Sequence, residues 1–217
     1  ILNGWCIEMG RKNLGYPETG VTKHPYAPCY LFDAAIAPME QFPVKGVVWY
    51  QGESNDYDIR QHEKLFPILV ESWREYWGNP QMPFHFVQLS SLNRDHWPAF
   101  RDSQRRLAEQ IPHCEMAVSS DLGDSLDIHP RYKRPVGERL ARQALRHDYG
   151  MSVTPCGPVL KEAMWKGEKI VLTFDFADGL KTSDGKALRC FEVAGYDEVF
   201  VAVEAVIVEG KVVLKVP

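Results

Sequence analysis

The chain has 217 residues, of which 45% are hydrophobic and 12% aromatic, so it can bury the core of one domain or somewhat more. Its formal net charge is -4 and its acidic and basic residues are well mixed, without a long basic run, which argues against nucleic acid as a partner. No stretch reaches the roughly 18 apolar residues of a membrane-spanning helix, so a membrane partner is not expected either.

The first part of the chain carries little secondary-structure signal. Residues 1–28 are rich in Gly, Pro and polar residues without a sustained period, so we expect mostly loop there. Residues 34–39 are a candidate for a short helix. Because Ile1 stands where an initiator methionine would, and Pro217 directly follows the strand-like run KVVLKV, we expect an internal piece of a longer protein.

Strand-like and helix-like patterns alternate in the middle of the chain. Three short apolar runs are typical of strands buried on both faces: residues 45–51, 83–90 and 113–120. Amphipathic helical patterns follow them: residues 59–77, 100–111 and 136–145. Asp56 or Asp58 can cap the first helix and Gly78 can end it. This alternation predicts an α/β fold with a parallel sheet, whose chemistry lies at the carboxyl ends of its strands.

Beyond Gly150 the pattern changes to alternating apolar and polar residues, which predicts antiparallel strands. The expected strands are residues 169–176, 190–193, 198–203 and 211–216. DG and EG turn signals separate them, at Asp178, Asp184 and Glu209. We therefore divide the chain into an α/β domain, residues 1–150, and a β unit, residues 151–217, that is short for a closed sandwich.

The first apolar run ends in WYQGESN, residues 49–55, at the carboxyl end of an expected strand. Gly52 permits close backbone approach, and the side-chain amide of Asn55 can donate to negative charge that develops on a carbonyl oxygen. A turn that caps the next helix would use the same residues, so the motif alone leaves both interpretations open. Glu53 is either a general acid or base or, in better agreement with such a loop, an organiser of the loop through hydrogen bonds.

A histidine lies among several acids in DLGDSLDIHPRYK, residues 121–133, after the third apolar run. A serine hydrolase needs a neutral imidazole to accept the hydroxyl proton, and a carboxylate or carbonyl group to orient the ring. His129 has the chemistry for that role. A loop of solvated acids before a helix is an equally good interpretation of this stretch taken alone.

Other polar residues give weaker signals. Arg101 and Gln104 are three residues apart on a helical pattern, and we expect them at the surface. The remaining histidines lack metal-ligand spacing, so neither a metal nor an organic cofactor is expected. The cysteines show neither CxxC nor zinc-like spacing, and we expect them to be small buried hydrophobic residues. They are Cys6, Cys29, Cys114, Cys156 and Cys190.

Taken together, four segments resemble the sialate O-acetylesterase family of SGNH-type hydrolases: FPVKGVVWYQGESN, FRDSQRRLAEQIP, MAVSSDLGD with DIHPRYKRPVGERLA, and FEVAGYDEVFVAVEAVI. WYQGESN and DIHP are the most specific of them. The resemblance implies a flavodoxin-like three-layer parallel sheet, followed by a partial antiparallel β-sandwich segment. It also implies that Gly52 and Asn55 belong to the family's third sequence block, with Asn55 an oxyanion donor, and that His129 is the catalytic histidine.

The chain departs from the family pattern first in its nucleophile. It contains neither a GQSNM-like block, which carries the family's reactive serine, nor the Gly-rich second block. We therefore expect the nucleophile to lie outside this chain, and residues 1–150 to lack the first strands of the hydrolase domain.

The second departure concerns the acid of the triad. SGNH hydrolases usually have an aspartate three residues before the histidine, where this chain has Leu126. We prefer Asp127 to Asp124 and Asp121 for orienting His129, and a carboxylate oxygen must then lie within about 3.2 Å of Nδ1. The backbone carbonyl of Leu126 could orient the ring instead, which would leave a dyad.

The resemblance implies a carbohydrate esterase that removes O-acetyl groups from sialic acid or related glycans, and we expect it to work by serine acyl transfer. An acetylxylan esterase and a catalytically inactive carbohydrate-binding or structural module are the alternatives. Missing first strands would expose an apolar sheet edge, to be covered by residues 1–28 or by a homodimer. The resemblance also implies a periplasmic or extracellular location.

Overall fold

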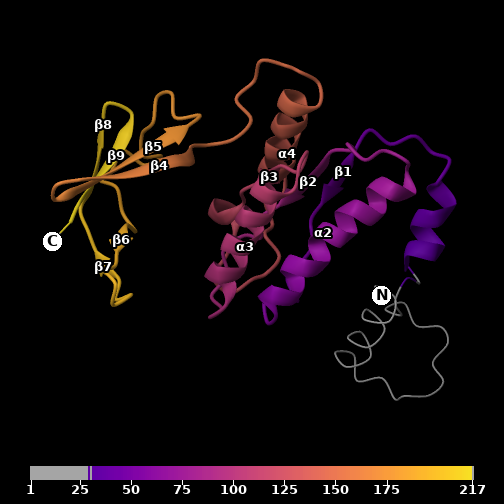
Figure 1. Cartoon of the computed structure of the whole chain (residues 1–217), viewed down its shortest axis with the longest axis horizontal. Helices are drawn as coiled ribbons and strands as arrows, with labels where there is room; N and C mark the ends of the chain where they lie inside the picture. The colour runs from indigo at the N-terminus through magenta and orange to yellow at the C-terminus, as the bar shows by residue number, and fades with distance from the viewer. Residues whose placement is uncertain (1–28, 30, 217) are drawn as a thin grey trace.

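The protein is described here by a computed structural model, which covers residue 29 and residues 31–216. The loop expected over residues 1–28 lies outside the described residues. An α/β region comes first along the chain and antiparallel β-structure follows it (Figure 1). The last helix of the first region ends at His147 and the first antiparallel strand begins at Val159.

Three parallel strands form the sheet of the α/β region: β1 (Val47–Trp49), β2 (Phe84–Val87) and β3 (Met116–Ala117). Their order is β1-β2-β3, so the expected parallel sheet is confirmed and β2 is its central strand. All four residues of β2 are buried. The expectation of burial on both faces is wrong for β1, because the side chain of Val48 faces solvent and the residue is 64% exposed.

Three long helices cover the two faces of the sheet: α2 (Ile59–Tyr76), α3 (Trp97–Gln110) and α4 (Arg134–His147). Residues of α2 and α3, such as Phe66, pack against Phe84 and Phe86 on one face. Leu140 of α4 packs with Val87 on the other face. The alternation of side chains along β2 therefore places helices on both sides of the sheet. Because α4 lies over β2 and β3, it leaves Val48 of β1 uncovered.

The start of α2 follows from its cap. The Asp58 carboxylate accepts a hydrogen bond from the Gln61 backbone N–H at 2.9 Å, so Asp58 and not Asp56 is the N-cap. The helix ends at Tyr76, and Gly78 adopts a left-handed φ of +61° just after it, as expected for a glycine that ends a helix.

A short π-helix, η1 (Phe32–Ile36), and a 3-10 turn, η2 (Ala37–Met39), occupy the region where a short helix was expected. They pack beside the end of α2. The Phe32 ring meets the Tyr76 ring edge-on at 5.2 Å, and the Tyr76 hydroxyl donates to the Ala37 carbonyl oxygen at 3.0 Å.

The antiparallel part contains β4 (Val159–Lys166), β5 (Lys169–Asp175), β6 (Glu192–Val193), β7 (Val201–Ala202), β8 (Ala205–Val208) and β9 (Lys211–Lys215). One sheet has the order β4-β5-β9-β8, and β6 pairs with β7. The sequence did not predict β4 or β8. The strands expected at 190–193 and 198–203 are shorter than predicted, because Cys190 (φ 63°) and Glu198 (φ 56°) have left-handed backbones that a strand excludes.

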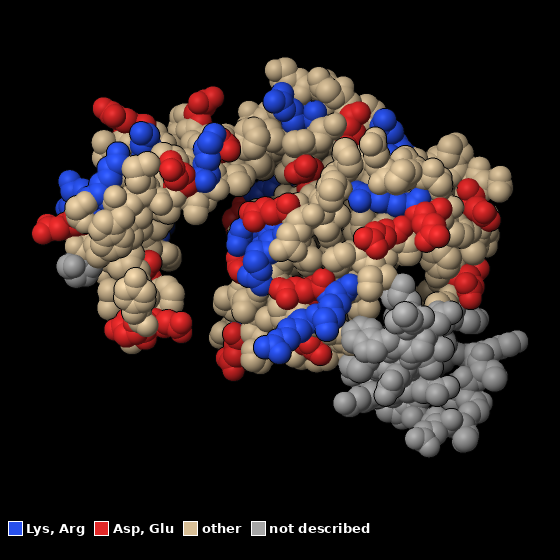
Figure 2. Space-filling view, viewed as in Figure 1, with Lys and Arg blue, Asp and Glu red and all other residues tan. Residues whose placement is uncertain are grey.

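Charged residues of both signs are interspersed over the visible face of both regions (Figure 2). This agrees with the mixed charge pattern of the sequence. Among the described helices, none combines the length and the apolar character that a membrane crossing requires.

Candidate functional site

The two motif-bearing loops both follow parallel strands. Residues 50–58 follow β1, and residues 118–133 follow β3. Carboxyl ends of parallel strands meet at one edge of a sheet, so the two loops belong to the same edge. One buried cluster anchors both of them: Tyr50 from the first loop and Ile128 from the second pack against Leu89, Trp97 and Phe100.

The backbone of the first loop depends on Gly52. This residue is buried with a φ of +137°, and a Cβ at this position would lie 3.5 Å from the Phe100 ring. The Asn55 N–H donates to the Gly52 carbonyl oxygen at 2.8 Å, which closes a tight turn. The Gly52 N–H is not free for a substrate, because it donates to the Glu53 carboxylate at 2.9 Å. Glu53 thus organises the loop through a hydrogen bond, as one of its two sequence interpretations proposed.

Arg94, in the segment between β2 and α3, forms hydrogen bonds to the same loop. Its Nη1 donates to the Glu53 carbonyl oxygen at 3.1 Å and to the Asp56 carboxylate at 3.2 Å. The guanidinium group also lies 5.5 Å from the centre of the Trp97 ring. The sequence analysis missed Arg94, although its position after the second predicted strand is a signal that could have drawn attention to it.

Asn55 lines a cavity of about 480 Å³ between the end of β1, α2 and η1. Its side chain makes no hydrogen bond to any other described residue, so its amide N–H groups are free to donate. Trp49, Phe66 and Trp73 make much of the cavity wall apolar. His62, also unrecognised in the sequence, lies in this wall with its ring 4.7 Å from that of Phe100. Burial lowers the pKa of His62 from 6.5 to about 4, and nearby Glu63 only partly opposes this effect.

His129 lies on the second loop with its side chain 85% exposed. Its Nδ1 is 3.6 Å from the Asp127 carboxylate, which is too long for a hydrogen bond and does not meet the 3.2 Å criterion. The Asp127 carboxylate instead accepts the backbone N–H of His129 at 2.9 Å. The described residues therefore show no formed triad in this conformation.

The other two acids of this loop have different partners. Asp124 accepts the Leu126 backbone N–H at 2.8 Å. Asp121 forms a double hydrogen bond with Arg139 at 2.6 Å for each contact, and this partner lowers the pKa of Asp121. Neither carboxylate forms an ion pair with a His129 ring nitrogen within 4 Å in the described part of the chain.

Two surface expectations need correction. Gln104 is only 1% exposed, and its Oε1 accepts the Leu89 N–H at 3.0 Å, so it supports the backbone after β2. Arg101 is half-buried, exchanges hydrogen bonds with Gln88, and has its pKa lowered by burial. Both residues are therefore framework groups: Gln104 binds the backbone of Leu89, and Arg101 binds the side chain of Gln88 in the same segment.

The cysteines also differ from expectation. Cys114 is buried and Cys156 is half-buried, whereas Cys29 and Cys190 are exposed, and Cys6 lies outside the described residues. Within the described ranges, no group of three or more His, Cys, Asp or Glu side chains is arranged to hold a metal ion.

The chain is similar to known carbohydrate esterases. A family model described as carbohydrate esterase, sialic acid-specific acetylesterase, matches residues 23–146, a span that includes both loops. Sialate O-acetylesterase of Mus musculus is 34% identical over 196 residues, and that of Homo sapiens is 30% identical over 225 residues. These matches cover 79% and 89% of this chain.

A solved structure of a carbohydrate acetylesterase is also similar to this chain. A carbohydrate acetylesterase from Xanthomonas citri matches with a TM-score of 0.75 and 36% sequence identity, over 82% of this chain. The chain spans 36% of the mouse relative, 42% of the human relative and 43% of the Xanthomonas chain.

Proposed function

The chain belongs to the carbohydrate esterase family of sialic acid-specific acetylesterases, and we propose that it forms part of an enzyme that removes O-acetyl groups from sialic acid or related glycans. The observation that carries this proposal is the family match over residues 23–146, because it spans both WYQGESN and DIHP. We assign residues 1–150 to an SGNH-type, flavodoxin-like domain and residues 151–217 to part of a β-sandwich.

The proposed chemistry is serine acyl transfer. A serine from outside this chain attacks the acetyl carbonyl carbon while His129 accepts its proton. The tetrahedral intermediate then expels the sugar oxygen, which takes the proton from His129. Water activated by the same histidine attacks the acetyl-enzyme, so that acetate leaves and the serine is restored.

Asn55 is the proposed oxyanion donor of this chain. Its side-chain amide faces a cavity without a hydrogen-bond partner among the described residues, which is the state that such a donor needs. The role of Gly52 is to give the backbone the turn that places Asn55, because Glu53 already occupies the Gly52 N–H. Asp127 is the nearest described carboxylate to His129, and we propose that a ring rotation brings the two into hydrogen-bond distance when the site is complete.

The uncovered edge of the sheet has a proposed structural role. β1 is an outer strand, and its middle residue, Val48, is unusually exposed for a residue of a parallel sheet. We propose that further strands of a longer chain, or a second copy of this chain, cover this edge. Sedimentation of this chain tests the second option, since a monomer at all concentrations excludes the homodimer.

Acetate release from O-acetylated sialic acid tests the catalytic proposal. It should be measured for this chain, for a form extended by its upstream coding sequence, and for the extended form with His129→Ala. Activity only in the unsubstituted extended form is expected, and His147→Ala, a change of another exposed histidine, should leave that activity intact. Asn55→Ala should lower kcat by about 100-fold or more.

Three outcomes would overturn parts of the proposal. Full activity in the short chain would place the nucleophile within these residues. No activity in any form would favour a binding module, whereas activity restricted to acetylated xylan would favour the acetylxylan esterase alternative.

A further inference from the structure

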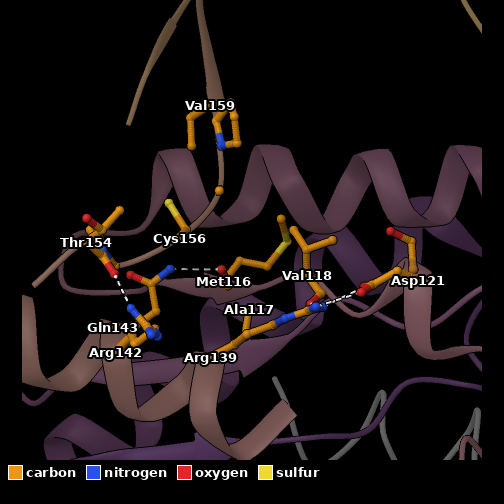
Figure 3. Close-up of a pocket in the computed structure, with 14 residues that line it drawn as sticks. Met116, Ala117, Val118, Asp121, Arg139, Arg142, Gln143, Thr154, Cys156 and Val159 are labelled. Carbon is orange, nitrogen blue, oxygen red and sulfur yellow. Dashed lines mark hydrogen bonds and ion pairs between the residues drawn. The ribbon is translucent and has the colours of Figure 1, made fainter. Parts of the chain in front are cut away.

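A second cavity, of about 590 Å³, lies beside β3, the outer strand on the other side of the sheet from β1 (Figure 3). It is separate from the cavity that Asn55 lines. Its walls are the outer edge of β3, one face of α4, and the segment 154–159 that leads into β4. The volume is within the usual range of about 300–1,000 Å³ for small-molecule sites. Neither WYQGESN nor DIHP contributes a residue to it.

Side chains of α4 already bind the outward-facing carbonyl groups of this sheet edge. Gln143 Nε2 donates to the Met116 carbonyl oxygen at 3.1 Å, and Arg139 Nη1 donates to the Val118 carbonyl oxygen at 2.7 Å. Arg139 is further neutralised by Asp121. An additional β-strand would have to displace these bonds, so the cavity suits a small ligand better than an extended peptide.

The floor of the cavity contains a buried acceptor without a donor. Gln143 is 4% exposed, and its Oε1 has no hydrogen-bond partner among the described residues. The amide cannot be turned over, because its oxygen would then face the Met116 carbonyl oxygen. A buried acceptor without a hydrogen bond is destabilising, so a ligand that donates a hydrogen bond to Gln143 Oε1 gains affinity.

The rim of the cavity contains a cation that is not neutralised. Arg142 is exposed, contacts the Thr154 carbonyl oxygen at 3.5 Å, and forms no ion pair within residues 31–216. Figure 3 shows Arg142 and Gln143 beside Thr154, with the Cys156 thiol above them. Burial raises the pKa of the Cys156 thiol, helped by Glu115 and partly opposed by a hydrogen bond with the Gln143 side chain, so this group stays neutral. The Glu115 carboxylate lies 3.7 Å from His147 Nδ1, and Asp121, which lines the cavity, is paired with Arg139.

We propose that this cavity is a non-catalytic binding site for a small carboxylated sugar. The sugar carboxylate pairs with Arg142, and a hydroxyl or amide N–H of the sugar donates to Gln143 Oε1. Apolar faces of the ring pack against Met116, Pro158 and Val159. The proposal rests on these contacts and not on the proposed catalysis.

Titration calorimetry of this chain with N-acetylneuraminic acid tests the site, with its methyl ester as the uncharged probe. We expect Arg142→Gln to weaken binding by about tenfold or more, since a hydrogen-bonded charge pair is lost. Arg146→Gln, one turn further along α4 and outside the cavity, is the matched control and should bind as the unsubstituted chain does. The methyl ester should bind as weakly as the acid binds to Arg142→Gln.

The position of the sugar is tested separately. NMR signals of the Met116 methyl group and the Gln143 side-chain amide should shift on titration, and Gln143→Leu should weaken binding if its melting temperature shows that it folds. The double variant His129→Ala, Asn55→Ala should bind unchanged. No binding at millimolar sugar, equal binding by Arg142→Gln, or loss of binding in the double variant would each overturn the proposal.

Discussion

Gly52 has a backbone conformation that other residues adopt only at a cost. At a φ of +137° an L-residue is strained by about 1–3 kcal/mol, whereas an added Cβ would make only an ordinary van der Waals contact with Phe100, at 3.5 Å. We therefore predict that Gly52→Ala lowers the free energy of unfolding by about that amount in urea denaturation. Gly137→Ala is the control, since a Cβ there meets nothing within 4 Å and lies inside α4. That control should be neutral or stabilising by up to about 1 kcal/mol.

His62 makes the stability of the α/β region depend on pH. Its pKa is about 4 in the folded protein and 6.5 for an unperturbed histidine, so the unfolded state binds more protons between these values. The contribution of His62 is complete above pH 6.5 and is lost as pH falls towards 4. It amounts to at most about 3 kcal/mol.

The measurement is the free energy of unfolding of the unsubstituted chain and of His62→Leu at pH 7 and pH 4.5. The loss on acidification should be smaller in His62→Leu, because carboxylates titrate in both proteins and their effects cancel. His147→Gln removes an exposed histidine and should show the same loss as the unsubstituted chain. Equal pH dependence in all three proteins would contradict the assignment.

At the scale of elements, the parallel sheet and its helices could be predicted because burial imposes a period on the sequence. β2 is mainly apolar since helices cover both its faces, and the apolar stripe on α2 faces Phe84 and Phe86. β4 could not be predicted, because all eight of its residues are exposed and no alternation arises. The rule that chemistry lies at the carboxyl ends of parallel strands located both loops. The sequence spacing of Asp127 and His129 does not determine their side-chain torsions, which place Asp127 Oδ1 3.6 Å from His129 Nδ1.

The loop after β1 depends on the segment between β2 and α3. Arg94 is the link between them, through the Glu53 carbonyl oxygen and the Asp56 carboxylate. We predict that Arg94→Ala speeds hydrogen exchange of the Asn55 and Asp58 amides, whose hydrogen bonds lie within this loop, while amides of β2 keep their protection.

Arg134→Ala is the control for Arg94→Ala. It removes an exposed arginine that pairs only with Glu138 along α4 among the residues described, and exchange at Asn55 should not change. Unaltered exchange at Asn55 in Arg94→Ala would show that the turn at Gly52 stabilises the loop without the Arg94 hydrogen bonds.

For the whole molecule, the hydrophobic clusters separate along the chain. Members of the first three clusters come from residues 44–140, and those of the fourth come from residues 170–214. Each cluster therefore draws its residues from one region only. Since cooperative unfolding is transmitted by shared core contacts, we expect the α/β region and the antiparallel region to open as two units.

A pair of cavity-creating variants tests this expectation. Leu214 is buried in the cluster of the antiparallel region, and Leu140 is buried between α4 and the sheet of the α/β region. Loss of a buried leucine side chain costs about 2–5 kcal/mol, and the cost falls on the unit that contains the cavity. Hydrogen exchange should therefore speed up throughout β5, β8 and β9 in Leu214→Ala while β2 keeps its protection, and Leu140→Ala should give the reverse. If either change accelerated exchange equally in both regions, the two would form a single cooperative unit, and the division near residue 150 would have no thermodynamic meaning.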